Sequence, residues 1–140
     1  MSHPTRLASR NPFGSYSLSA EGNLLFARFE GVVNENLAQR YQEDIYQLVE
    51  TFQGRPWAYV FVAEKFDATT RSSFETLVEV YRYCRQRQCM IAVYNMTSAL
   101  GKAQIRSMLE AAGLCSELDQ VLFDSERDAA EFAQHFLEAI

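Results

Sequence analysis

Three short apolar runs in the second half of the chain constrain its fold more than any other feature. The runs are Trp57–Ala63, Cys89–Tyr94 and Val121–Phe123, and amphipathic helical patterns separate them. Apolar runs without polar alternation are typical of strands buried on both faces, and intervening helices indicate crossover connections in a mainly parallel sheet. The second half therefore predicts a β-α-β-α-β-α order, with Glu64–Arg71 as a polar connection between the first strand and its helix.

The first half adds a hairpin and a helix. Tyr16–Ala20 and Leu24–Glu30 are predicted strands, and Gly22 between them can take the positive backbone angle of a tight turn. Asn34 suits a helix N-cap, and Gly54 ends the apolar stripe of that helix. We therefore expect a flexible arm over residues 1–14 and one α/β domain over residues 15–140. Its predicted order is β-β-α-β-α-β-α-β-α, a mixed, mostly parallel sheet covered by helices.

Composition narrows the classes of function. The chain has 140 residues and is 48% hydrophobic, which suits one globular domain with a sizeable core. Its net charge of −5 repels a phosphate backbone, so we expect no nucleic-acid partner. Its three cysteines and two histidines show no metal-ligand spacing, so we predict no metal and no cofactor.

The sequence also indicates where the protein resides. Cys84 and Cys89 fall in predicted core elements and are interpreted as reduced thiols, which suits the cytoplasm. The first twelve residues lack the apolar run of a signal peptide, and nowhere are there enough consecutive apolar residues to span a bilayer. We therefore expect a cytoplasmic protein that is neither exported nor inserted into a membrane.

The order of elements resembles the STAS family, which includes anti-sigma-factor antagonists of the SpoIIAA type and the cytoplasmic domains of sulfate transporters. The resemblance covers residues 15–140. It rests on the hairpin, Leu24–Gly31 leading into the first helix, a hydroxyl-rich turn after Ala58–Ala63, and Phe123-Asp124-Ser125 before a short last helix. It implies the fold of the small stand-alone SpoIIAA-like bacterial proteins and a non-catalytic regulatory module that binds a protein partner.

The resemblance also implies a switch residue. In the family, a partner kinase phosphorylates a serine in an Asp-Ser-Ser-Gly motif at the start of the second helix. Thr70-Arg71-Ser72-Ser73 aligns with that motif, which makes Ser72 the candidate phosphorylation site. Thr70 replaces the aspartate and Ser73 replaces the glycine, and both departures argue against a working phospho-switch. The competing interpretation is structural, because Ser72 and Glu75 have the spacing of a capping box.

A ligand crevice is the alternative function. Ligands of open α/β sheets bind beyond the carboxyl ends of the parallel strands, where helix N-termini present free amides. This crevice would bind a small anion, a polar metabolite or a lipid. Its candidate residues are Asn34, Asp67, Thr69, Thr70, Ser73, Asn95, Thr97 and Ser98, together with Ser72.

The sequence offers no catalytic residues. A serine nucleophile needs a histidine base, and neither His3 nor His135 belongs to the loop that carries Ser72. We therefore expect a protein that is not an enzyme. Both a monomer and a two-fold homodimer are left open, and a dimer would use exposed aromatics such as Phe52, Tyr81 or Tyr83.

Overall fold

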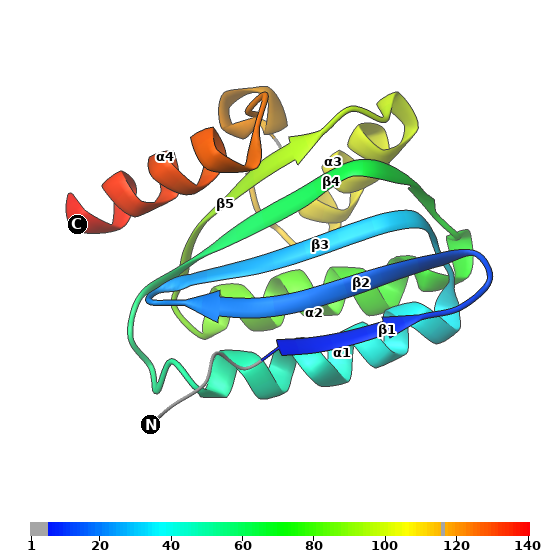
Figure 1. Cartoon of the computed structure of the whole chain (residues 1–140), viewed down its shortest axis with the longest axis horizontal. Helices are drawn as coiled ribbons and strands as arrows, with labels where there is room; N and C mark the ends of the chain where they lie inside the picture. Colours follow the sequence, from blue (N-terminus) through cyan, green and yellow to red (C-terminus); the bar gives the residue numbers. More distant parts are fainter. Residues whose placement is uncertain (1–5, 116) are drawn as a thin grey trace.

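The computed structural model describes residues 6–115 and 117–140 and shows a five-stranded sheet with helices on both faces (Figure 1). The strands lie side by side in chain order. β1–β2 and β2–β3 are antiparallel pairs, whereas β3–β4 and β4–β5 are parallel. The strands are β1 (Arg6–Arg10), β2 (Gly14–Glu21), β3 (Leu24–Val33), β4 (Trp57–Thr69) and β5 (Cys89–Met96). The predicted α/β fold, with a mixed sheet covered by helices, is confirmed.

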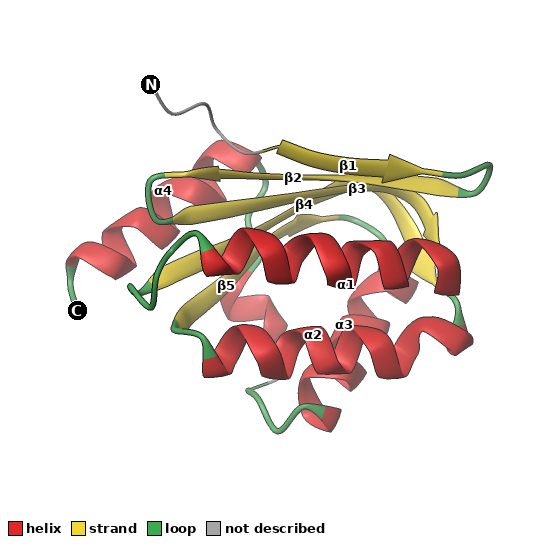
Figure 2. Ribbon diagram, turned by 90° about the horizontal axis from the view of Figure 1, so that it is seen from below, coloured by secondary structure: helices red, strands yellow, loops and turns green. Residues whose placement is uncertain are grey.

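Four α-helices and two short 3-10 turns complete the domain. They are α1 (Glu35–Glu50), η1 (Arg71–Ser73), α2 (Phe74–Gln86), α3 (Ala99–Ala111), η2 (Leu118–Val121) and α4 (Glu126–Glu138). Helices α1, α2 and α3 cover one face of the sheet, and α4 lies on the other (Figure 2). The sheet is therefore the middle layer of a three-layer arrangement in which one outer layer is a single helix.

Two separate cores hold these layers together. The larger lies between the sheet and α1–α3, and it includes Trp57, whose ring stacks on Phe52 with 5.1 Å between centroids. The smaller lies under α4, where Ala129 and Ala133 pack against Phe26 and Val60. Burial of apolar surface on both faces explains why β4 reads as an unbroken apolar run in the sequence.

The predicted N-cap of the first helix is confirmed, and the last helix begins with a cap of the same kind. Asn34 caps α1, because its side-chain oxygen accepts a hydrogen bond of 3.0 Å from the amide of Leu37. Ser125 caps α4 in the same way through the amide of Asp128. Such caps satisfy amides that have no partner inside the helix.

The predicted flexible arm is wrong where the structure describes it. Residues 1–5 lie outside the described part of the chain, but Arg6–Arg10 form β1 and pair with β2, and Gly14 already begins β2. The sequence pattern did not predict β1, because an edge strand is held by backbone hydrogen bonds and needs no apolar run.

Two further element predictions are wrong. Most of the predicted polar connection Glu64–Arg71 belongs to β4, which continues to Thr69 beside β3. The predicted strand Val121–Phe123 is replaced by the η2 turn and a single bridge between Leu122 and Tyr94. Backbone pairing with β3 extends β4 through polar residues, whereas among the described residues the chain at Leu122 pairs with β5 through a single bridge.

Candidate functional site

The candidate site lies where β3, β4 and β5 end. We call the rim the residues 33–36, 67–73 and 96–101, which are the ends of these strands and the first residues of α1, η1 and α3. All three connections lie at the right-hand end of the molecule in Figure 1, next to the turn between β1 and β2. The structure thus brings together segments that are far apart in the sequence.

Hydrogen bonds tie the start of η1 to the end of β3. The amide of Thr70 donates to the carbonyl of Val33 over 2.9 Å. The buried hydroxyl of Ser73 donates to the carbonyl of Thr70 over 2.7 Å. The same hydroxyl lies 3.4 Å from the carbonyl of Val33. Asn34 follows Val33 directly, and its side chain also accepts from the amide group of Asn11 over 3.0 Å. These bonds fix Asn34, Thr70 and Ser73 in one network.

The start of α3 is tied to the end of β4. The Ser98 hydroxyl donates to the carbonyl of Asp67 over 2.6 Å and accepts from the amide of Gly101 over 2.9 Å, so that it caps α3. The Thr97 hydroxyl donates to the carbonyl of Glu64. The amide of Thr69 is bound by the side chain of Gln104, which also donates to the Thr69 carbonyl. Most polar groups of the predicted crevice are therefore already used within the fold.

Asn95 corrects the predicted set of rim residues. Its side chain is buried on the α4 side of β5, where its amide group donates to the carbonyl of Phe123 over 3.1 Å. It is therefore not open to a ligand or partner at the rim. The alternation of side chains along a strand explains this position, because its neighbour Met96 belongs to the core on the other face.

Ser72 is exposed and does not cap the helix. The helical segment begins with η1 rather than at Ser72, and the residue before α2 is Ser73. The Ser72 hydroxyl lies 3.1 Å from that of Thr70 and makes no capping bond. The predicted capping box of Ser72 and Glu75 is therefore wrong. Ser73 is the structural serine of the pair, and the Ser72 side chain faces solvent.

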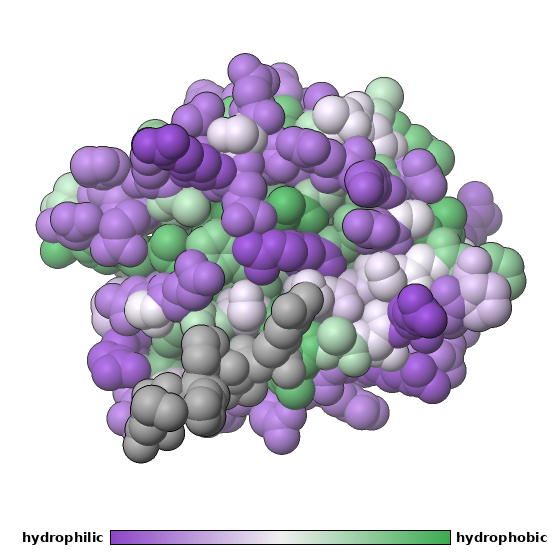
Figure 3. Space-filling model, in the orientation of Figure 1, coloured by the Kyte–Doolittle hydropathy of each residue, from purple (hydrophilic) through white to green (hydrophobic). Residues whose placement is uncertain are grey.

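The rim also carries apolar surface that the sequence did not reveal. Leu100, in the first turn of α3, is 60% exposed, and Phe13, in the turn between β1 and β2, is 65% exposed. We include Phe13 in the rim, because its carbonyl accepts a hydrogen bond of 3.0 Å from the amide of Val32 at the end of β3. Gly31 permits this approach, since its φ is +72° and a Cβ there would lie 2.4 Å from that carbonyl. In Figure 3, hydrophobic atoms occur at this end near the start of α3.

The aromatics predicted for a dimer interface lie elsewhere. Phe52 is buried against Trp57, so its assignment to an exposed surface is wrong. Tyr81 is half-buried and accepts from Tyr94, and Tyr83 stacks on Tyr46. Tyr81 and Tyr83 of α2 therefore already contact other aromatic residues of the same chain, which leaves less of each ring for a dimer interface.

Neither a cluster of metal ligands nor a helix that could span a membrane occurs among the described residues. Over residues 6–115 and 117–140, no three histidine, cysteine, aspartate or glutamate side chains lie together as metal ligands would. No helix in that part of the chain is long and apolar enough to cross a bilayer.

No protein-family model matches the sequence, and no curated protein matches it significantly. Solved structures do match the fold. An anti-sigma factor antagonist from Mycobacterium paratuberculosis superposes with a TM-score of 0.59 at 10% identity, covering 93% of this chain and 95% of that one. SLC26A9 superposes with a TM-score of 0.59 at 11% identity, covering 84% of this chain. The chain spans only 20% of the SLC26A9 chain.

These two matches define the class of fold. The chain has the three-layer α/β fold of an anti-sigma factor antagonist, over almost the whole length of both chains. The fold implied by the resemblance to the STAS family is thus confirmed. The particular role of this protein is a separate question.

Proposed function

We propose that the protein is a non-catalytic regulatory module that binds a protein partner through the rim, in the manner of an anti-sigma factor antagonist. The observation that carries the proposal is the exposed Ser72 hydroxyl at a helical start, on a rim that also presents Phe13 and Leu100. Exposed apolar side chains among polar groups are typical of protein-binding surfaces.

The fold supports this proposal. An anti-sigma factor antagonist, as its name states, opposes another protein. No described residue of the rim combines a nucleophile with a nearby histidine base, because His135 lies in the last turn of α4. A protein-binding role therefore needs fewer assumptions than catalysis.

We further propose that charge at Ser72 weakens partner binding. Because Ser72 makes no capping bond, a negative group there disturbs only its exposed hydrogen bond with the Thr70 hydroxyl. The amides at a helical start favour negative charge, so the fold tolerates a phosphate at this position. At the same time the charge would lie at the same end of the sheet as the exposed apolar groups, where it opposes an apolar contact.

The test compares Ser72→Glu with the wild type as bait for proteins from the source cells, with each captured protein quantified by mass spectrometry. Ser107→Glu is the matched control, because Ser107 is an exposed serine on α3 outside the rim. We expect a partner that Ser72→Glu captures at least several-fold less than the wild type and Ser107→Glu do. Equal capture by all three baits would contradict the proposed switch.

A second variant tests the surface without the switch. Phe13→Ser with Leu100→Ser removes the two exposed apolar side chains and leaves the core intact, because neither residue is buried. We expect the same partner to be lost while the melting temperature stays within a few degrees of the wild type. Undiminished capture by this double variant would place the binding surface away from the rim.

A further inference from the structure

A cavity of about 470 Å³ lies between the sheet and helices α2 and α3. Packed protein interiors contain few voids larger than a water molecule. This cavity has room for roughly 15 groups of the size of water, each with a share of about 30 Å³. Its size instead falls within the range of small-molecule binding sites.

The inner wall of the cavity is apolar. It includes Phe61 and Phe66 of β4, Leu77 of α2, and Ile105 and Met108 of α3. In Figure 2, α3 slants away from the sheet behind α2, and the chain after it returns toward the sheet. The cavity lies along this slant, and an apolar chain placed in it would be removed from water.

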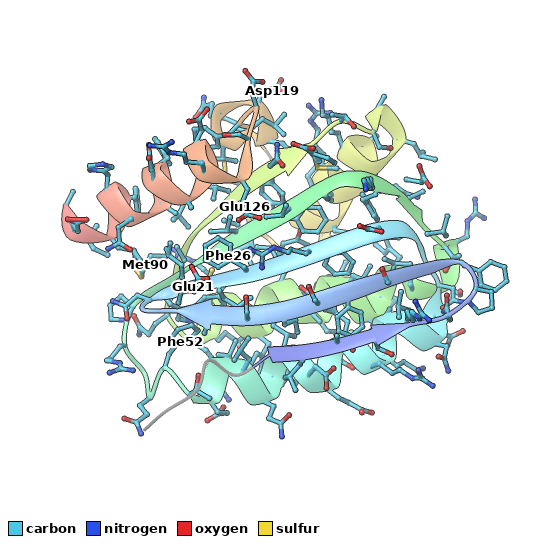
Figure 4. All side chains as sticks on the ribbon, viewed as in Figure 1. Glu21, Phe26, Phe52, Met90, Asp119 and Glu126 are labelled. Atoms are coloured by element: carbon cyan, nitrogen blue, oxygen red, sulfur yellow. The ribbon has the colours of Figure 1, made fainter. Side chains whose placement is uncertain are left out.

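The cavity opens to solvent beside the segment that follows α3. Five of the residues that border it are exposed: Arg85, Gly113, Cys115, Glu117 and Gln120. Met90, which is labelled in Figure 4 at the start of β5, borders it as well and is half-buried. A ligand can therefore enter beside the start of β5.

Four tyrosines line the cavity and are paired through their hydroxyls. Tyr41 and Tyr59 lie 2.6 Å apart at their oxygens, and Tyr94 donates to Tyr81 over 3.2 Å. Each pair has two hydroxyl hydrogens but forms one hydrogen bond, so one hydrogen in each pair is left over. Because Tyr81 accepts from Tyr94, its own hydrogen is free for a further acceptor.

These hydroxyls stay protonated at neutral pH. Burial raises the pKa of Tyr81, and it raises the pKa of Tyr41, Tyr59 and Tyr94 still more clearly. The nearby thiols are also neutral, because burial raises the pKa of Cys89 to about 12 and that of Cys84 well above its usual value. The interior of the cavity thus offers hydrogen-bond donors and no negative charge.

A positive charge lies at the opening. Arg85 follows Tyr81 by one turn of α2, so both side chains lie on the side of the helix that borders the cavity. The Arg85 guanidinium donates to the carbonyl of Cys89 over 3.3 Å and has no carboxylate partner among the described residues. Glu117 also borders the opening, but it is exposed to solvent.

We propose that the cavity binds an aliphatic monocarboxylate, with its head group at Arg85 and Tyr81 and its hydrocarbon tail among Phe61, Phe66 and Ile105. A guanidinium and a neutral hydroxyl are both donors, which is what a carboxylate requires. A tail of about ten carbons fits the volume. Of the rim residues only Val33 and Thr69 border the cavity, and neither is tested as part of the partner surface, so this site and the proposed partner surface can fail independently.

The test is calorimetric titration of the full chain with decanoate below its micellar concentration. We expect saturable binding of one molecule per chain, and we expect Arg85→Gln to weaken it about tenfold, as the loss of one charge-assisted hydrogen bond does. Arg82→Gln is the matched control, because Arg82 is an exposed arginine of α2 that bonds the carbonyl of Ala111 and does not border the cavity. Decanol, which has no charge, should bind correspondingly more weakly than decanoate.

A second variant locates the binding site. Ala92 is half-buried on β5 and borders the cavity, so Ala92→Phe places a ring in the space that the tail would occupy. With folding verified by circular dichroism, this variant should lose decanoate binding. The proposal is overturned if the wild type shows no saturable binding, if Ala92→Phe binds as well as the wild type, or if Arg82→Gln weakens binding as much as Arg85→Gln.

Discussion

The two faces of the sheet are built differently. Under α1–α3 the core is aromatic. The ring centroid of Phe29 lies within 6.3 Å of the ring centroids of Tyr41, Phe61 and two other aromatic residues. Under α4 the core contains fewer buried residues. There the guanidinium of Arg28 lies over the ring of Phe26, 5.0 Å from the ring centroid. Figure 4 shows Glu126 at the start of α4 close to Phe26.

This difference indicates which face of the sheet contributes more to the stability of the fold. A face covered by three helices can bury large side chains and still leave space for a cavity. A face covered by one helix combines a few small residues with a charged pair at its edge. We therefore expect substitutions on the α1–α3 face to have large effects and those on the α4 face to have smaller ones.

The largest expected contrast comes from two phenylalanines on the same strand. Phe29 and Phe26 are both buried on β3 but point to opposite faces. Phe29→Ala should lower the free energy of unfolding by about 5 kcal/mol and Phe26→Ala by about 3 kcal/mol, because ring contacts add to the area lost. Urea denaturation of both variants measures this, and equal losses would remove the distinction between the faces.

Alkaline pH should act through the α1–α3 face alone. Its buried tyrosines have raised pKa values, whereas no described residue of the α4-side cluster is a tyrosine. The folded chain keeps these protons while the unfolded chain loses them above about pH 10, so stability is complete below that pH and falls as the pH rises further.

The slope of that fall can be tested by substitution. Each fully buried tyrosine contributes about 1.4 kcal/mol per pH unit to the loss, so Tyr94→Phe should show a correspondingly shallower decline than the wild type. Urea midpoints measured from neutral to strongly alkaline pH give the slope. A decline that Tyr94→Phe leaves unchanged would mean that other groups cause it.

The smallest expected effect concerns the charged pair at the edge of α4. Arg28 donates to both carboxylate oxygens of Glu126 over 3.1 and 3.0 Å, but both side chains are more than one-third exposed. Glu126→Gln should therefore cost at most about 1 kcal/mol, and less at high salt. Glu131→Gln, which breaks the more exposed pair with Arg127, serves as the control and should cost about 0.3 kcal/mol. A cost above that of Phe26→Ala would show that charge, rather than apolar burial, holds α4 in place.

The sequence predicted the parts of the fold that depend on local patterns. Buried apolar runs identified β4 and β5, and Asn34 identified the start of the first helix. It did not predict β1 because backbone pairing at an edge leaves no apolar pattern. It misplaced the cap near Ser72 because the choice between Ser72 and Ser73 depends on contact with the distant carbonyl of Val33.

The candidate site could be predicted only in part. The hydroxyl-rich segments were found because strand ends and helix starts have recognisable residues. Phe13 and Leu100 were missed because exposure of a single apolar side chain is set by tertiary packing. The cavity was missed for the same reason, since Tyr41, Tyr59, Tyr81 and Tyr94 come from four different elements and meet only in the folded chain.

The agreement between strand order and chain order has a consequence for how the molecule assembles. Each new strand finds its neighbour at the growing edge of the sheet, so no strand has to be inserted between two that are already paired. The two antiparallel pairings close short turns, whereas the parallel β3–β4 and β4–β5 pairings each close a loop that contains a helix, α1 or α2, and form more slowly. Helix α4 comes last, and until it docks, Phe26, Val60 and Val93 remain open to water. The final helix of the chain is thus what protects the nascent sheet from association with other chains.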